Sequence, residues 1–333
     1  MKILKYIFIF ILLALLGIVT YLYSLTFSPN GRLDWGQALF LKMNTGLNVQ
    51  QLKKMTISER VHSADGVAIN LDGLQIDTLK ITADSLTTYI FKPKNLSQNS
   101  PVIVFFHGGG FTLPWTNICT VGASRFCRVF NTIVVAVDYR VAPEYPFPIP
   151  NNDCYATLLW TIANIKDWGG NPNQIVVAGL SAGATLAATV TIKAQQQHLT
   201  NIKYQILDCP VTYLPFKTNA YQKLQSGNQE QEIDKYILES YLPNISDRSN
   251  PLALPYFADS LSNLPPAYVV TCEFDPIKDT GRDYAVKLKK ARVPVIHQEM
   301  KGMGHSMAGP FNESDRVNLC RQIAEDARKY LNK

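Results

Sequence analysis

Short apolar runs that alternate with segments of helical length limit the fold of this chain more than any other feature. Each of five runs is four to six residues long and carries no charge. Strands of this kind are buried on both faces of a sheet, and intervening helices supply the cover. We therefore predict an α/β fold with a mostly parallel central sheet and helices on both faces. The runs are residues 102–106, 132–137, 174–178, 204–207 and 267–271, and the clearest helical segments are 154–165 and 182–196.

Two segments depart from this rhythm. Residues 74–81 and 87–91 alternate apolar and polar side chains, which predicts antiparallel strands at the start of the sheet. Residues 210–264 are rich in tyrosine, proline and polar side chains and contain no strong strand pattern. A structureless loop of this length is uncommon, and the aromatic content disfavours disorder, so we expect an inserted helical cap.

The N-terminus predicts a membrane segment. Tyr6 to Tyr23 is a stretch of 18 residues without a charge, preceded by Lys2 and Lys5. At about 1.5 Å per residue a helix of this length just spans a hydrocarbon core of about 30 Å. No small-residue cleavage site follows, and Tyr21, Tyr23 and Phe27 are typical of an interfacial aromatic belt.

These features favour an uncleaved anchor in residues 1–27 over a cleaved secretory signal. The lysines would then remain cytoplasmic, with one domain of residues 28–333 on the exported side, periplasmic, luminal or extracellular. A protein secreted after signal cleavage is the alternative.

Composition excludes several other classes. The net charge of +6 is modest, and no basic stripe interleaved with aromatic residues points to nucleic acid. No clustered His and Cys ligands suggest a metal, and no cofactor is expected. Cys209 and Cys272 lie in or beside apolar runs and are expected to be small buried hydrophobes, although some pairing of the six cysteines stays open if the domain is exported. The oligomeric state is open, and a homodimer is compatible with the sequence.

The pentapeptide Gly179-Leu-Ser-Ala-Gly183 is the sharpest chemical signal. It follows an apolar strand and opens an alanine-rich helix, which is the context that a nucleophile elbow requires. Glycines are needed where the turn is tight and neighbouring backbone comes close. The pentapeptide alone also fits an ordinary glycine turn, but its context makes Ser181 the candidate nucleophile.

A second signal is His107-Gly-Gly-Gly, directly after the first apolar run. Successive glycines let backbone N–H groups point into one space, as a tetrahedral oxyanion requires. A phosphate-binding loop is disfavoured because no lysine-serine pair follows. We expect Gly108 and Gly109 to donate, together with the amide of Ala182, and His107 to be structural.

A serine needs a base, and three histidines follow Ser181 in the chain. His198 lies at the end of the helix that the elbow opens, and His297 lies within a strand-like segment. His305 lies in a loop just after that strand. In parallel α/β folds, catalytic bases occur in loops that follow the carboxyl ends of strands. We therefore expect His305 to be the base.

Three acids compete to orient that base, all directly after the run 267–271. Asp275 precedes Pro276, which is able to start a helix and leave the carboxylate beyond the strand end. Asp279 suits a cap of the following helix, expected over 281–291. Glu273 is a weaker third candidate, so Asp275 is preferred.

These motifs together resemble the hormone-sensitive lipase family of α/β-hydrolases, including the membrane-anchored arylacetamide deacetylase type. The resemblance covers roughly residues 85–310 and also includes Asp138-Tyr-Arg-Val-Ala-Pro-Glu144, Asp275-Pro-Ile-Lys-Asp279 and Gly304-His-Ser306. It implies the roles given above for the site residues, and a cap formed by about 28–60 and 210–264. Leu180 departs from the small polar residue usual in the family, and Ala184 replaces a frequent glycine.

The expected activity is hydrolysis of a small-molecule carboxylic ester by a serine carboxylesterase, through an acyl-enzyme formed by Ser181, His305 and Asp275. The cap tyrosines and Trp115 suggest an apolar acyl pocket, with a place in the core of the cap as the alternative for these residues. Short-to-medium acyl chains are the preferred substrates. An amidase or deacetylase would use the same residues, and a non-catalytic ligand-binding homologue is the remaining alternative.

Overall fold

The predicted apolar runs form the centre of one eight-stranded sheet with the order β10-β9-β8-β7-β5-β6-β4-β3. The computed structural model describes residues 2–43, 49–64, 69–81, 85–225, 227–307 and 312–331. The strands are β3 (Leu74–Ile81), β4 (Leu86–Pro93), β5 (Ser100–Phe106), β6 (Ile133–Val137), β7 (Gly170–Leu180), β8 (Ile202–Asp208), β9 (Ala267–Cys272) and β10 (Val295–Met300).

The sheet is parallel from β10 through β6, and β4 and β3 are added antiparallel at one edge. Strands β5, β6, β8 and β9 have almost wholly buried side chains, as expected for a sheet covered on both faces. The structure thus confirms the predicted α/β fold and its mostly parallel sheet.

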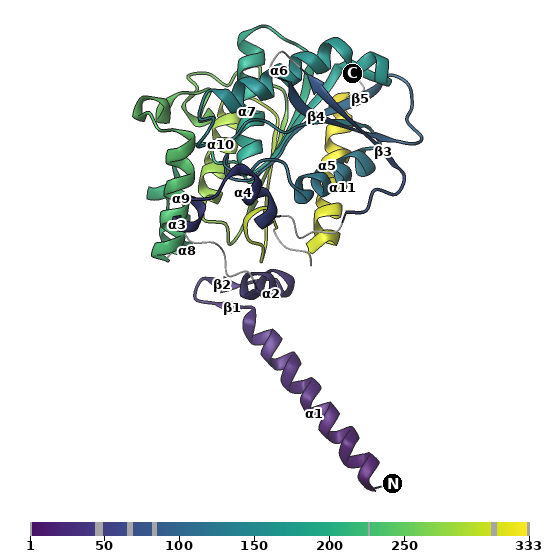
Figure 1. The fold of residues 1–333 in the computed structure, drawn as a ribbon, viewed down its shortest axis with the longest axis vertical. Helices are drawn as coiled ribbons and strands as arrows, with labels where there is room; N and C mark the ends of the chain where they lie inside the picture. Colours follow the sequence, from purple (N-terminus) through teal and green to yellow (C-terminus); the bar gives the residue numbers. More distant parts are fainter. Residues whose placement is uncertain are drawn as a thin grey trace.

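Helices cover the two faces of the sheet (Figure 1). On one face α6 (Ile149–Asn164), α7 (Ala182–Gln196) and α10 (Lys278–Lys290) contribute to a single apolar core. On the other face α5 (Asn117–Phe130) and α11 (Glu313–Leu331) form a second core. Since α7 begins directly after β7, the first residues of this helix lie at the carboxyl edge of the sheet.

The described residues of the insertion 210–264 form short helices joined by turns and irregular segments, and they contain no strand. The elements are η2 (Pro215–Lys217), α8 (Asn219–Leu224), α9 (Asn228–Tyr241), η3 (Ile245–Ser249) and η4 (Pro255–Phe257). The ring of Tyr241, at the end of α9, stacks on Phe111 with centroids 3.8 Å apart. This contact holds the insertion against the glycine loop that follows β5.

The N-terminal region precedes the sheet as a chain of small elements. They are α1 (Lys2–Leu25), β1 (Phe27–Ser28), β2 (Gly31–Arg32), α2 (Trp35–Met43), α3 (Val49–Leu52) and α4 (Ile57–Ala64). Figure 1 shows α1 projecting away from the rest of the molecule. Among the described helices it is the one long and apolar enough to cross a membrane, over Lys5–Leu25 with a mean hydropathy of 2.5. An N-terminal helix of this length and composition suits either a membrane anchor or a signal sequence.

Residues after α1 contact the same edge of the sheet as the insertion. The Asp34 amide donates to the Gly302 carbonyl at 2.8 Å. The buried Arg60 guanidinium donates to the Ala142 carbonyl at 3.0 Å and pairs with Glu144 at 2.6 Å. The expected cap segments include residues 44–48 and 226, which lie outside the described residues.

Several predicted boundaries were wrong. Strand β7 extends to residues 170–180 rather than 174–178, because its first residues pair with β5 across a register shift between Ser100 and Val102. Helix α6 begins at Ile149 rather than residue 154, with a proline in its first turn, where no N–H is needed. Helix α10 begins at Lys278, so Asp279 lies inside its first turn and is not its cap.

Candidate active site

The turn between β7 and α7 holds Ser181 in a strained conformation. Its φ is 53° and its ψ is −119°, values that a residue with a side chain rarely adopts. The flanking glycines make this turn feasible. A Cβ on Gly179 would lie 2.1 Å from the Gly183 carbonyl oxygen, and one on Gly183 would lie 2.1 Å from the Phe106 carbonyl oxygen. The Ser181 amide donates to the Asp208 carbonyl at 2.7 Å, which ties the turn to the end of β8.

A chain of hydrogen bonds links three residues that follow three different strands. The Nε2 atom of His305 lies 2.8 Å from the Ser181 Oγ, and its Nδ1 atom lies 2.8 Å from the Asp275 carboxylate. Ser181 follows β7, Asp275 follows β9 and His305 follows β10. The Asp275 side chain is buried, and the His305 side chain is 38% exposed. The structure therefore brings together the three residues that the sequence predicted as nucleophile, acid and base.

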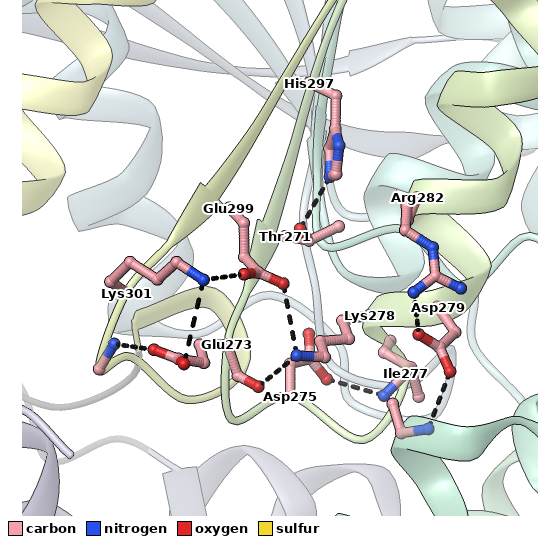
Figure 2. Close-up of polar contacts among 12 residues, drawn as sticks. Thr271, Glu273, Asp275, Ile277, Lys278, Asp279, Arg282, His297, Glu299 and Lys301 are labelled. Atoms are coloured by element: carbon pink, nitrogen blue, oxygen red, sulfur yellow. Dashed lines mark hydrogen bonds and ion pairs between the residues drawn. The ribbon is translucent and has the colours of Figure 1, made fainter. Parts of the chain in front are cut away.

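The two competing acids are directed elsewhere (Figure 2). Glu273 forms an ion pair with Lys301 at 3.9 Å. Asp279 forms an ion pair with Arg282 at 2.7 Å within α10. Of these carboxylates, Asp275 alone reaches the His305 ring.

The two competing histidines also lie away from Ser181. His297 is within β10 and its Nε2 atom is 2.9 Å from the Thr271 hydroxyl (Figure 2). Burial lowers the pKa of His297, which favours a neutral ring. His198 follows the carboxyl end of α7, whereas Ser181 precedes its amino end.

The glycines after β5 lie beside the elbow. A Cβ on Gly108 would meet the Leu180 carbonyl oxygen at 3.0 Å and the Ser181 Cβ at 3.5 Å. Gly109 has a φ of 115°, which favours glycine. Within the described part of the chain, the amides of Gly108, Gly109 and Ala182 donate to no protein acceptor. They are therefore free to donate to a ligand.

A layer of aromatic rings supports this glycine loop. The buried His107 ring stacks on Tyr139 with centroids 4.0 Å apart, and its Nδ1 atom is 2.7 Å from the Gly108 carbonyl oxygen. The Tyr139 hydroxyl donates to the His107 carbonyl at 2.8 Å. Asp138 accepts from the Trp115 amide at 2.9 Å. These contacts fit the expected structural role of His107.

The electrostatic surroundings of His305 suit a proton acceptor. Burial lowers the pKa of His305, but the Asp275 charge and hydrogen bond and the nearby Cys209 raise it, and the net pKa is well above the ordinary value of 6.5. An imidazole with a raised pKa is a stronger base toward a serine hydroxyl. Burial is also the main reason why the pKa of Asp208 is raised.

One group of metal-ligand type exists among the described residues, and it overlaps this site. Atoms of Cys209, Asp275 and His305 lie within 4.8 Å of one another. Asp275 and His305 already bond to each other, so a cation held there would break the link between these two residues.

Sequence reasoning missed two neighbours of the site. The Asp208 carbonyl accepts from the Ser181 amide, and the Cys209 Sγ accepts from the Ser306 amide at 3.4 Å. No motif singled out either residue, because both contacts depend on the register of β8 against its neighbours. Asp138 and Tyr139, which brace the glycine loop, belong to a motif already recognised in the sequence.

Comparison with known proteins decides the family. Residues 103–309 match a family of α/β hydrolase fold, which is more than half of the chain. The chain belongs to this family. Its hormone-sensitive-lipase-like character, predicted from the sequence, is confirmed.

Several named relatives of this α/β-hydrolase are esterases. An arylesterase of Saccharolobus solfataricus is 30% identical over 244 residues, 72% of this chain and 79% of the relative. The carboxylesterase NlhH of Mycobacterium tuberculosis is 33% identical over 232 residues, 68% of this chain and 73% of the relative. The crystal structure of a thermostable esterase from Pseudomonas putida superposes with a TM-score of 0.79 and 28% identity, covering 92% of this chain and 99% of that one. The protein is a carboxylic ester hydrolase.

We expect Asp275→Asn to lower kcat by about 10⁴-fold, by analogy with other triads in which the orienting acid becomes an amide. The same change should shift the acidic limb of the kcat/KM–pH profile. With His305 as the base, activity would require its neutral form, so a raised pKa would place this limb at higher pH, and removal of the carboxylate should move it to lower pH. Steady-state kinetics between pH 5 and pH 9 would measure both effects.

The matched control is Glu273→Gln, which neutralises an acid of the same loop that does not reach His305. Its pH profile should match that of the unaltered protein. An acidic limb that stays in place in Asp275→Asn would contradict the assignment of Asp275.

Proposed function

We propose that this ester hydrolase is a serine carboxylesterase that works through an acyl-enzyme on Ser181. The observation that carries the proposal is the continuous hydrogen-bond chain from Ser181 through His305 to Asp275. A serine hydroxyl is a weak nucleophile until a base accepts its proton, and that base needs an orienting acid.

Each step of the proposed reaction uses one or more of these three side chains. His305 Nε2 accepts the Ser181 proton as the Oγ attacks the ester carbonyl carbon, and Asp275 stabilises the imidazolium that forms. The imidazolium then gives its proton to the departing alcohol. Water attacks the acyl-enzyme with His305 again as the base, which releases the acid and restores Ser181.

The proposed oxyanion hole consists of the amides of Gly108, Gly109 and Ala182. Their lack of a protein acceptor among the described residues supports this role, as does the approach of Gly108 to Ser181. Donors fixed before the reaction stabilise the negative charge without having to reorganise, and the loss of one such donor typically costs about 10²–10³ in kcat. The first turn of α7 adds the positive end of a helix dipole.

We expect Ser181→Ala to lower kcat for p-nitrophenyl acetate by at least about 10⁴-fold, because no other group replaces the nucleophile. Ser124→Ala is the matched control, because Ser124 is a buried serine of α5 whose hydroxyl donates within its own helix. Thermal unfolding of both variants would verify that they are folded. Activity retained in folded Ser181→Ala would rule out the acyl-enzyme.

We propose short-to-medium acyl chains as the preferred substrates. Ile237 of α9 approaches the glycine loop so closely that a Cβ on Gly110 would lie 3.0 Å from its Cγ2 atom. This contact leaves little room above the loop. In a series of p-nitrophenyl esters, kcat/KM should fall for long chains, and Ile237→Ala should move the optimum to longer ones. A maximum at the longest chain in the unaltered protein would contradict this preference.

We further propose that residues 1–27 are an uncleaved membrane anchor. Residues 28–333 then form the hydrolase domain, with a cap from about 28–60 and 210–264. This domain lies on the exported side of the membrane. The apolar side chains from Tyr6 to Tyr23 are exposed on all sides, as a bilayer would require. The Arg32 guanidinium lies 4.6 Å from the centre of the Tyr23 ring, which gives a cation and an aromatic residue at the expected interface.

Deletion of residues 1–25 should move the protein from the membrane fraction to the soluble fraction while its activity on p-nitrophenyl acetate is retained. The full chain should resist extraction by alkaline carbonate and dissolve in detergent. Recovery of the full-length chain in the soluble fraction would contradict the anchor, and a mature N-terminus beyond residue 20 would indicate a cleaved signal.

A further inference from the structure

Two cysteines face each other directly behind the candidate catalytic residues. Cys209 follows β8 and Cys272 is the last residue of β9, and their Sγ atoms are 3.6 Å apart. Both side chains are buried and both thiols are free. The Cys209 amide donates to the Val270 carbonyl at 2.9 Å, which keeps the two strand ends together. The sequence left the pairing of the six cysteines open, and the structure singles out this pair.

Each of the two cysteines accepts a hydrogen bond from a segment that contains a candidate catalytic residue. The Cys209 Sγ accepts from the amide of Ser306, the residue next to His305, at 3.4 Å. The Cys272 carbonyl accepts from the Asp275 amide at 3.1 Å. The Cys209 Sγ also lies within 4.8 Å of both the Asp275 carboxylate and a His305 ring nitrogen. Movement of either cysteine would therefore displace the acid or the base.

The backbone of Cys209 is strained. Its φ of 53° lies in the left-handed region, which is uncommon for a residue other than glycine, asparagine or aspartate. Such strain persists only where the surroundings impose it, and it is concentrated at functional positions.

We propose that Cys209 and Cys272 are an oxidation site that controls the esterase, in which a disulfide between them lowers kcat. The effect on catalysis rests on the function proposed above, whereas formation of the disulfide does not. Hydrogen peroxide is the oxidant. One thiolate attacks it to give a sulfenic acid and water, and the second thiol displaces a second water as the S–S bond forms. The two thiols lose two electrons and two protons in total, and one peroxide becomes two waters.

Bond formation requires a movement large enough to disturb catalysis. A disulfide has an S–S length of about 2.05 Å, so the two sulfur atoms must approach by about 1.5 Å from their present separation. Misplacement of reacting groups by about 1 Å can cost about 10²-fold in rate. Because both cysteines bond to the segments of Asp275 and His305, we expect kcat to fall by at least about tenfold, with a smaller change in KM.

The surroundings of Cys209 set the pH at which oxidation proceeds. The hydrogen bond with Cys272 and burial raise the pKa of the Cys209 thiol, and the charges of Asp208 and Asp275 raise it further. Since the thiolate is the reactive form, oxidation should be slow at neutral pH and faster as the pH rises. His305 has a ring nitrogen within 4.8 Å of the Cys209 Sγ and can accept the thiol proton.

The test treats the full chain in detergent with hydrogen peroxide and follows both the bond and the activity. Peptide mass spectrometry without reductant should find residues 209 and 272 linked with the loss of two hydrogens. The kcat on p-nitrophenyl acetate should fall at least about tenfold and return with dithiothreitol, which reduces disulfides but not methionine sulfoxide. This distinction matters because Met303 and Met307 flank His305.

Variants identify the responsible pair. After peroxide treatment, Cys272→Ser should keep the activity that it had before treatment. If Cys272→Ser fails to fold, Cys209→Ser takes its place in the test and should give the same result. Cys154→Ser alters a buried cysteine of α6, and peroxide should lower its activity as much as it lowers that of the unaltered protein. No linkage between residues 209 and 272, linkage without a fall in kcat, or equal and reversible inactivation of Cys272→Ser would each overturn the proposal. Protein that forms the linkage but never hydrolyses an ester would instead refute the proposed function.

Discussion

The hydrogen bonds of the His305 ring to Ser181 and Asp275 are the contacts on which the account of this protein depends. Their three residues are remote in sequence and meet because β7, β9 and β10 are parallel and end at one edge of the sheet. A parallel sheet places successive loops at its carboxyl edge, so a site there draws on several loops at once. The helices of both faces fix the strands, and the strands fix the distances of 2.8 Å on which proton transfer would depend.

The close approach of backbone segments around Ser181 is the second constraint on the site. Gly179 and Gly183 leave no space for a Cβ, and Gly108 lies against the elbow itself. The serine is consequently held with φ positive, and its own amide is anchored to the Asp208 carbonyl. Rigid glycine turns of this kind orient backbone N–H groups without side chains that would fill the space meant for substrate. The insertion contacts the glycine loop through Ile237 and Tyr241.

The sequence predicted the architecture, and which residues meet at Ser181, more reliably than the contacts around them. Continuous apolar runs were sufficient to predict the parallel sheet, and strand–turn–helix context was sufficient to select Ser181. The position of Asp275 before a proline separated it from Asp279, although the helix start was misplaced by three residues against the predicted 281. The pairing of Cys209 with Cys272 and the bond from Asp208 to Ser181 were beyond prediction, because each depends on how β8 aligns with a neighbouring strand. Strands buried on both faces lack the alternation of apolar and polar side chains that would indicate their register.

Reaction with a fluorophosphonate probe, followed by mass spectrometry of the labelled peptides, tests the central claim most directly. Such probes phosphonylate a serine only where a base activates it and nearby donors accept the developing charge. The account predicts one adduct on Ser181, slowed strongly in His305→Ala and absent in Ser181→Ala. Folded, ester-hydrolysing protein that carries no label on Ser181, or that carries it at the same rate without His305, would contradict the account.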